Sequence, residues 1–118
     1  MVRPAREGEA LAIAGGLWLG GQRPLVAVQS TGLFEAGDAL RNLVYDLRLP
    51  LFLIVGCRGY FAQRAGSADT AQHFAEPMLQ AWELSYTVVD RPTSAGQLGA
   101  VYCQAQLAGA SHVLLLAE

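Results

Sequence analysis

Two acidic residues stand at the start of a segment that is otherwise small and apolar. They are Glu7 and Glu9, separated by Gly8, and the segment that follows contains Gly15 and Gly16. A carboxylate in the first turn of a helix is stabilised by the partial positive charge of the unpaired N–H groups there, and this role alone could account for both residues. Glycines inside a helix are unfavourable, each by about 0.5–1 kcal/mol relative to alanine. Their presence indicates that a neighbouring helix or a ligand packs close to the backbone.

Polar residues follow three of the expected strands, at residues 29–32, 56–59 and 90–92. In open α/β sheets, ligands bind beyond the carboxyl ends of the strands. We therefore expect these three segments to converge with the entry to the first helix, residues 6–8. A site built there would combine a carboxylate with amide and guanidinium groups.

The elements that must position these groups follow from apolar patterns that alternate between helix and strand. Residues 51–55 form a continuous apolar run, which is typical of a central strand in a parallel sheet. The order predicts a three-layer α/β domain with a mainly parallel sheet of at least four strands and right-handed crossovers. The expected helices cover residues 7–19, 35–47, 71–84 and 94–107, and the expected strands cover residues 25–29, 51–56, 86–89 and 113–116.

Length and composition narrow the class of protein. The 118 residues suit a single domain over residues 1–118, and the net charge of −2 with no basic run argues against a nucleic-acid partner. No apolar run reaches about 18 residues and the N-terminus lacks a secretory pattern, so we expect neither a membrane span nor export. Cys57 and Cys103 are far apart and have no metal-ligand spacing with His73 or His112. We expect buried, reduced thiols in a cytoplasmic protein without a metal site of its own.

Three motifs, taken together, resemble a known family. They are R-E-G-E-A-L-A-I-A-G-G-L-W-L-G-G at residues 6–21, P-L-V-A-V-Q-S-T-G-L at residues 24–33 and L-P-L-F-L-I-V-G-C-R-G at residues 49–59. In order and spacing they resemble the pyrimidine-binding domain of thiamine diphosphate-dependent decarboxylases, with the pattern closest to phosphonopyruvate and sulfopyruvate decarboxylases. The resemblance covers about residues 5–59, and residues 71–118 agree only in the order of elements.

The resemblance implies roles for four residues. Glu7 corresponds to the family glutamate that hydrogen-bonds N1′ of the cofactor's aminopyrimidine and promotes the imino form that activates the thiazolium. Gln29 would lie near the thiazolium and the substrate, or else cap the end of its strand. Gly32 fits a turn with positive φ. Arg58 could attract an anionic group of the substrate, or could be a solvated loop arginine.

This chain also departs from the family pattern. The family loop Q-N-S-G-L-G-N reads here as residues 29–35, with Phe34 in place of a glycine and Glu35 in place of an asparagine. A bulky ring and a new negative charge leave the identity of the substrate open. The strand, helix and strand that precede the glutamate in the family are missing, and the sequence has no G-D-G…N-N motif for magnesium and diphosphate. The resemblance therefore implies that a partner subunit or domain supplies Mg²⁺ and the diphosphate site, in a homo- or hetero-oligomer.

Two further functions stay open on the sequence. The chain could be a degenerate, non-catalytic α/β module that pairs with a partner, and the change at Phe34 and Glu35 favours this alternative. It could also be an unrelated flavodoxin-like domain. That fold would need a phosphate-binding loop directly after an early strand, and the sequence shows none.

Overall fold

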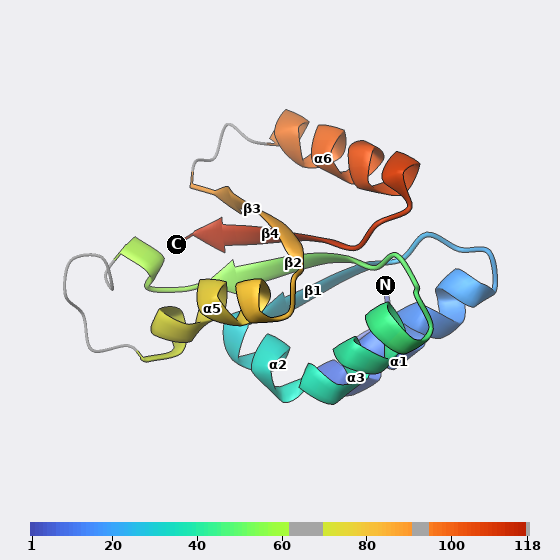
Figure 1. Ribbon diagram of the computed structural model, residues 1–118, viewed down its shortest axis with the longest axis horizontal. Coiled ribbons are helices and arrows are strands. Elements are labelled where there is room, and N and C mark those ends of the chain that lie inside the picture. The colour runs from blue at the N-terminus through green and yellow to red at the C-terminus, as the bar shows by residue number, and fades with distance from the viewer. Residues whose placement is uncertain (62–69, 91–94, 118) are drawn as a thin grey trace.

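The computed structural model describes residues 1–61, 70–90 and 95–117. Its strands form a four-stranded sheet in the order β1-β2-β4-β3, in which each neighbouring pair is parallel (Figure 1). The register places Gln29, Gly56 and Leu116 in one row near the carboxyl edge of the sheet. The strands are β1 (Leu25–Gln29), β2 (Phe52–Cys57), β3 (Ser85–Val89) and β4 (His112–Ala117).

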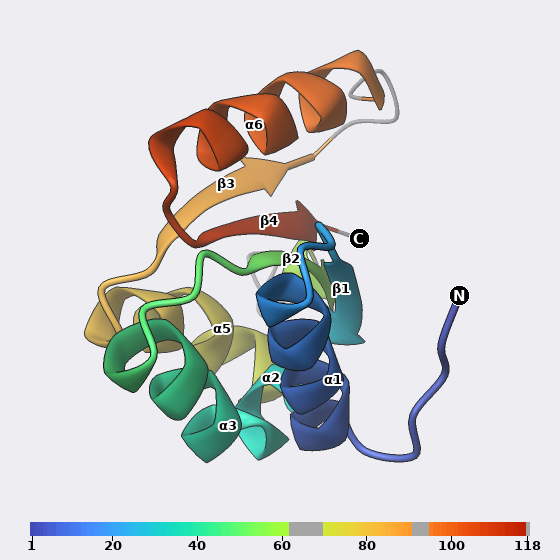
Figure 2. The ribbon, with the colours of Figure 1, turned by 90° about the vertical axis from the view of Figure 1, so that its right-hand side faces the viewer.

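Helices cover both faces of the sheet, which confirms the predicted three-layer α/β architecture. One helix, α6 (Ala95–Ala108), lies on one face beside β3 and β4, and the other helices lie on the opposite face (Figure 2). The opposite layer consists of α1 (Glu7–Leu19), α2 (Ser30–Glu35), α3 (Gly37–Arg41), the π-helical turn η1 (Asn42–Asp46) and α5 (Thr70–Ala81).

The two faces have cores of unequal size. The main core lies between the sheet and the larger helical layer, and includes Leu11, Leu33, Leu40, Leu53, Val55, Leu79, Val113 and Leu115. The second core lies beneath α6 and consists of Phe52, Ala105 and Leu114, with the ring of Tyr102 packed edge-on against Phe52 at 5.0 Å between centroids. Most of the apolar burial that stabilises the fold therefore lies on the side of α1, α2 and α5.

The first helix and first strand begin and end where the sequence predicts, at Glu7–Leu19 and Leu25–Gln29. The predicted start of the next helix at residue 35 is wrong, because the residues directly after β1 are already helical. Helix α2 begins at Ser30, directly after β1, and the chain bends at Ala36 before α3. Gly32 and Gly37 lower the helix propensity of this stretch, but burial of Leu33 and Ala36 in the main core outweighs that penalty.

A neighbouring helical turn explains Gly15 but not Gly16. A Cβ on Gly15 would lie 2.6 Å from Cδ2 of Leu43 in η1, so any other residue there would require the Leu43 side chain to shift. A Cβ on Gly16 would meet nothing within 4 Å. The predicted close approach to the helix therefore holds at one of the two glycines, and what approaches is the η1 turn.

The prediction that both cysteines are buried is half right. Both thiols are free, with Cys57 buried at the end of β2 and Cys103 exposed on α6. Cys103 lies in an apolar stretch, but only Ala105 among the described side chains of α6 is buried, so most of that helix faces solvent. Among the described residues, the longest helices fall short of the length and apolarity that a bilayer crossing requires.

Candidate functional site

The side chain of Glu7 lies directly over Gly32. Glu7 is the first residue of α1 and is half-buried, and Gly32 is a buried residue of α2. A Cβ built on Gly32 would lie 2.5 Å from Oε1 and 2.7 Å from Cδ of Glu7. The prediction that Gly32 serves a turn with positive φ is wrong, because Gly32 lies in a helix and is absent from the positive-φ glycines. Its lack of a side chain instead makes room for the carboxylate.

Glu35, one helical turn beyond Gly32, bonds the first turn of α1. The backbone N–H of Gly8 donates to Oε2 of Glu35 at 3.0 Å, and Nε of Arg6 donates to Oε1 at 3.0 Å. These bonds lower the pKa of the Glu35 carboxyl, the Gly8 N–H having the larger effect and the Arg6 guanidinium the next. On the other side of Gly8, the carboxylate of Glu9 accepts a hydrogen bond from the backbone N–H of Ala5 at 3.1 Å. Glu35, the negative charge that replaces the family asparagine, is therefore already paired within the chain.

A hollow of about 810 Å³ opens beside Glu7. It is lined by residues 1–7 and Ala10, by β1 along its length, and by residues of β2 and β4. Glu7 and Gln29 both line it, together with Gly56 and Leu116 of the same sheet row. The fold thus brings Glu7 and Gln29 to one cavity, as expected for the carboxyl edge of a parallel sheet.

Gln29 also lines a smaller hollow, of about 80 Å³, that contains Arg58. Arg58 is exposed and lies in the turn after β2, where Gly59 has a φ of 79°. Ser30, Thr31 and Gln72 complete the polar part of this hollow. Glu7 and Arg58 line different hollows, and Gln29 stands between them.

Sequence reasoning makes no functional prediction for Gln72, although the spacing of this residue on α5 carries a signal. Gln72, Ala75 and Leu79 are the buried residues of α5, at the i, i+3, i+7 spacing of one helical face. A glutamine among apolar residues on a core face needs a polar partner, and the thiol of Cys57 donates a hydrogen bond to its Oε1. That partner fixes the buried side chain at the back of the smaller hollow.

The third predicted segment, residues 90–92, is described only at Asp90. Asp90 is exposed at the end of β3 and lines neither hollow, and residues 91 and 92 lie outside the described residues. Within the described ranges, no group of three or more His, Cys, Asp or Glu side chains could hold a metal ion.

His112 lies at the opposite, amino end of β4. Its Nε2 lies 2.9 Å from the hydroxyl of Thr87, and its ring is stacked near Phe52 with 6.2 Å between centroids. Burial lowers the pKa of His112. These contacts give His112 a structural role at the start of β4.

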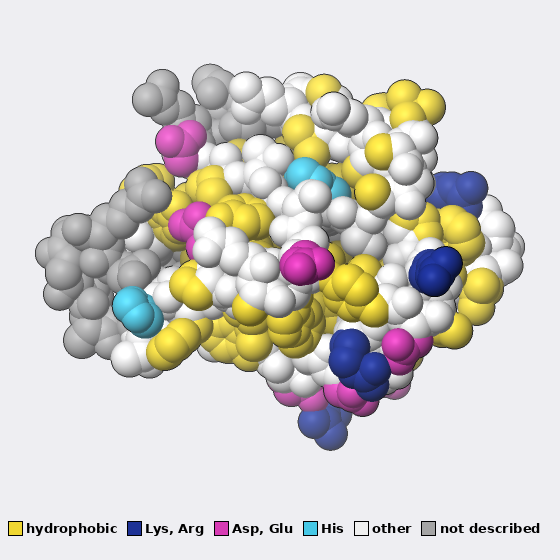
Figure 3. Space-filling model, in the orientation of Figure 1, with side chains coloured by type: hydrophobic (Ala, Val, Ile, Leu, Met, Phe, Trp, Pro, Cys, Tyr) yellow, Lys and Arg dark blue, Asp and Glu magenta, His cyan; other side chains and the backbone are white. Residues whose placement is uncertain are grey.

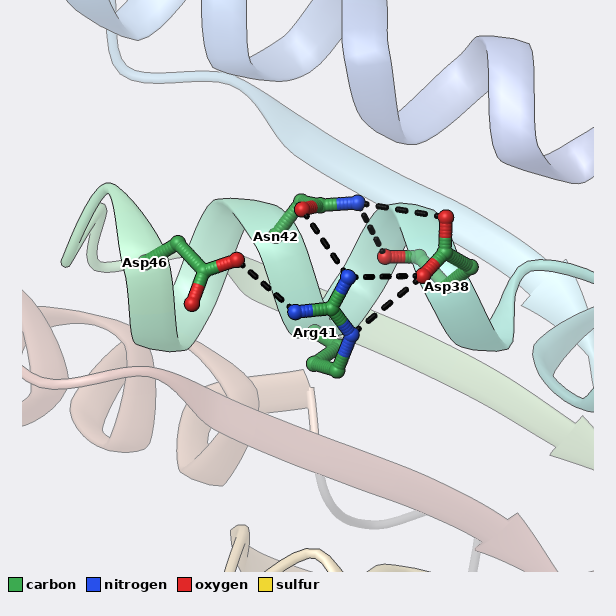
Figure 4. A network of polar contacts seen from close by, with 4 residues as sticks. All are labelled: Asp38, Arg41, Asn42 and Asp46. Carbon is green, nitrogen blue, oxygen red and sulfur yellow. Dashed lines mark hydrogen bonds and ion pairs between the residues drawn. The ribbon is translucent and has the colours of Figure 1, made fainter.

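A separate hollow of about 520 Å³ lies between α3–η1 and the end of α5. The guanidinium of Arg41, which lines it, is held by Asp38 at 2.9 Å and Asp46 at 2.8 Å, with a further bond to Asn42 (Figure 4). The space-filling view shows hydrophobic side chains gathered between α5 and α3, with charged side chains below and to the right around α3 (Figure 3). Because Arg41 is already paired with two carboxylates, its guanidinium is not free to bind an anionic ligand at this hollow.

Known proteins with similar sequences are decarboxylases. No family model matches the chain. The phosphonopyruvate decarboxylase of Streptomyces viridochromogenes is 30% identical over 108 residues, which are 87% of this chain and 26% of that protein. The sulfopyruvate decarboxylase of Methanosarcina acetivorans is 26% identical over 88 residues, covering 75% of this chain and 23% of that protein.

A third relative is closer to this chain in length. The sulfopyruvate decarboxylase subunit alpha of Methanococcus maripaludis is 25% identical over 93 residues, which are 79% of this chain and 56% of that protein. These similarities support a relationship to the phosphonopyruvate and sulfopyruvate decarboxylase family. The chain spans about a quarter to about half of the length of these relatives.

Proposed function

We propose that this chain is the pyrimidine-binding part of a thiamine diphosphate-dependent 2-oxoacid decarboxylase that acts on a pyruvate bearing an anionic substituent. The observation that carries the proposal is the placement of Glu7, whose carboxylate lies over the side-chain-free Gly32 at the edge of a large hollow. The names of the relatives support the reaction class.

The residues present suit the pyrimidine end of the cofactor. Gly32 leaves the space that a carboxylate needs to lie against α2, and Glu7 borders a hollow of about 810 Å³. Bound thiamine diphosphate would supply the electron sink for the electrons left behind when carbon dioxide departs. The carboxylate of Glu7 would hold a proton at N1′ of the aminopyrimidine, because a general acid–base must lie within hydrogen-bond reach of the proton that it moves.

Gln29 and Arg58 would serve the substrate. Gln29 lines both hollows, so its amide could orient a molecule that reaches from one to the other. The guanidinium of Arg58 in the smaller hollow could pair with the anionic substituent through charge-assisted hydrogen bonds. In this arrangement proton handling at Glu7 would be separated from anion binding at Arg58.

Mg²⁺ and the diphosphate would be held by a partner subunit or domain. The described residues hold no metal-ligand cluster, and one relative is itself named as a subunit. We therefore propose that the working enzyme is an oligomer in which this chain contributes half of the cofactor site. A single charge-assisted hydrogen bond contributes about 1.5–3 kcal/mol, less than the cost of association, so the chain alone should bind the cofactor weakly.

Substitution of Glu7 tests the proposal directly. The chain would be reconstituted with a subunit that carries the diphosphate motif, and carbon dioxide release from phosphonopyruvate and sulfopyruvate would be measured. Glu7→Gln keeps the shape of the side chain but cannot exchange the proton, so turnover should fall by about 10²–10⁴-fold while assembly is retained. Glu9→Gln, two positions further along α1, is the matched control and should keep turnover.

The outcome separates the proposal from its main alternative. Wild-type turnover in the Glu7→Gln complex would overturn the role of Glu7. A wild-type complex that assembles but releases no carbon dioxide from either substrate would favour the non-catalytic, degenerate module.

A further inference from the structure

The first turn of α1 lacks a capping side chain of its own. The first N–H groups of a helix have no partner within the helix and are usually bonded by a Ser, Thr, Asp or Asn at the N-cap. Here the N-cap is Arg6, in an extended conformation with φ −135° and ψ 149°, and its side chain makes no capping bond. A guanidinium has only donors, so Arg6 cannot accept a hydrogen bond from an N–H group. The cap must come from elsewhere.

Glu35 supplies it from another helix. Its Oε2 accepts the N–H of Gly8, the second helical residue, at 3.0 Å across 27 positions of sequence. Its Oε1 pairs with Arg6, the residue that should have provided the cap. One carboxylate therefore satisfies an N–H group of the first turn and also holds the N-cap side chain.

Helix α2, which contains the capping residue Glu35, also contains Gly32, against which Glu7 packs. Gly32 and Glu35 are three residues apart in α2, so both lie on the face directed at the start of α1. Glu7 is enclosed between these two contacts. Its side chain lies against Gly32, and the N–H of the next residue is bonded to Glu35.

We propose that Glu35 is a positioning residue, which fixes the first turn of α1 so that the Glu7 carboxylate stays over Gly32 at the hollow. The meaning of this placement for catalysis rests on the proposed function, but the placement itself is a property of this chain alone. The bond to Gly8 carries most of the effect. The pair with Arg6 contributes less, because the Arg6 side chain is 75% exposed and solvent screens such pairs.

Nuclear magnetic resonance of the isolated full chain tests the placement without cofactor or partner. Two signals report it: the Overhauser contact between the γ-protons of Glu7 and the α-protons of Gly32, and the exchange rate of the Gly8 amide proton. Glu35→Ala should abolish the first and raise the second by roughly tenfold, as expected for loss of a helix cap. Glu35→Gln keeps an acceptor oxygen at the same reach and should restore both signals.

Glu9→Ala is the matched control, since it removes a neighbouring carboxylate that bonds only the N–H of Ala5 among its described partners. It should leave the Glu7–Gly32 contact intact. If Glu35→Ala fails to fold, Glu35→Asp replaces it, because a shorter side chain of the same charge should lose the Gly8 bond and weaken the same contact. An unchanged contact in the folded variants, or an equal loss in Glu9→Ala, would overturn the proposal.

Activity measurements keep this inference separate from the proposed function. In the reconstituted complex, Glu35→Ala should lower kcat with little change in KM, and Glu35→Gln should recover most of kcat. If the wild-type complex shows no turnover at all, the proposed function fails while the resonance result on the isolated chain still decides the role of Glu35.

Discussion

At the position of Gly32, helix stability and carboxylate placement make opposite demands. An alanine there would favour α2 by up to about 1 kcal/mol, but its methyl group would fall 2.5 Å from Oε1 of Glu7. The long glutamate side chain can swing away at little cost. With alanine at position 32, the chain should therefore stay folded, but the carboxylate of Glu7 should move away from its position.

Gly32→Ala should thus leave the free energy of unfolding unchanged or slightly higher while turnover of the reconstituted complex falls at least tenfold. Urea denaturation and carbon dioxide release measure the two effects. Gly16→Ala is the matched control, because a Cβ there meets nothing within 4 Å. It should stabilise the chain by about 0.5–1 kcal/mol and keep turnover. A Gly32→Ala complex as active as the wild type would contradict the packing of Glu7 on Gly32.

The motif predicts Glu7, Gln29 and Gly32 as site residues, but the sequence could not supply the contacts among them. The role of Gly32 was predicted wrongly, since the motif shows that a glycine is needed and not which atom would fill its space. In the motif, Glu35 appears only as a new negative charge at the substrate site. Its partners, Arg6 and Gly8, lie 29 and 27 positions away, and only the packing of α2 against α1 reveals them.

At the level of elements, α1 and η1 pack through Gly15. A Cβ on Gly15 would lie 2.6 Å from Cδ2 of Leu43 and 3.4 Å from Cδ1 of Leu49. Overpacking of this kind costs about 1–3 kcal/mol, which exceeds the gain in helix propensity. Gly15→Ala should therefore lower the free energy of unfolding by about 1–2 kcal/mol, measured by urea denaturation.

A double-mutant cycle identifies the cause of that loss. Leu43→Ala removes the side chain that the new methyl group would strike, so Gly15→Ala should cost less in the Leu43→Ala background than in the wild type. An equal loss of free energy of unfolding in both backgrounds would show that contact with Leu43 is not the reason for a glycine at position 15.

Local signals explain which element boundaries the sequence could predict. Helix α1 is followed by Gly20 and Gly21, and β1 follows Pro24, so these boundaries are set by neighbouring residues. The segment from Ser30 to Asp46 contains Gly32 and Gly37, but no proline and no pair of adjacent glycines. It divides into α2, α3 and the π-helical η1 because of a bend at Ala36 and the packing against α1, which are tertiary effects.

For the molecule as a whole, two lowered pKa values set how stability responds to acid. The pKa of Glu35 lies below its ordinary value of 4.5, and that of His112 lies below its ordinary value of 6.5. In both cases the unfolded chain binds the proton at a higher pH than the folded chain. The two contributions are therefore complete above the ordinary pKa and decline as the pH falls through it.

Stability should accordingly decrease in two steps on acidification, the first beginning near pH 6.5 and the second below pH 4.5. Urea denaturation at closely spaced pH values measures both steps. His112→Gln should flatten the first step, and Glu35→Gln should flatten the second. A first step of unchanged size in His112→Gln would assign it to another group.

The contacts that hold Glu7 all fall within one helix–strand–helix unit, residues 6–35, which also contains Gln29. Arg58 and Gln72, at the smaller hollow, come from later parts of the chain. Under the proposed function, one short segment, residues 6–35, positions the carboxylate that handles the proton. Arg58, which would bind the anion of the substrate, lies outside that segment. Selection could then change which acid is accepted without disturbing how the cofactor is activated.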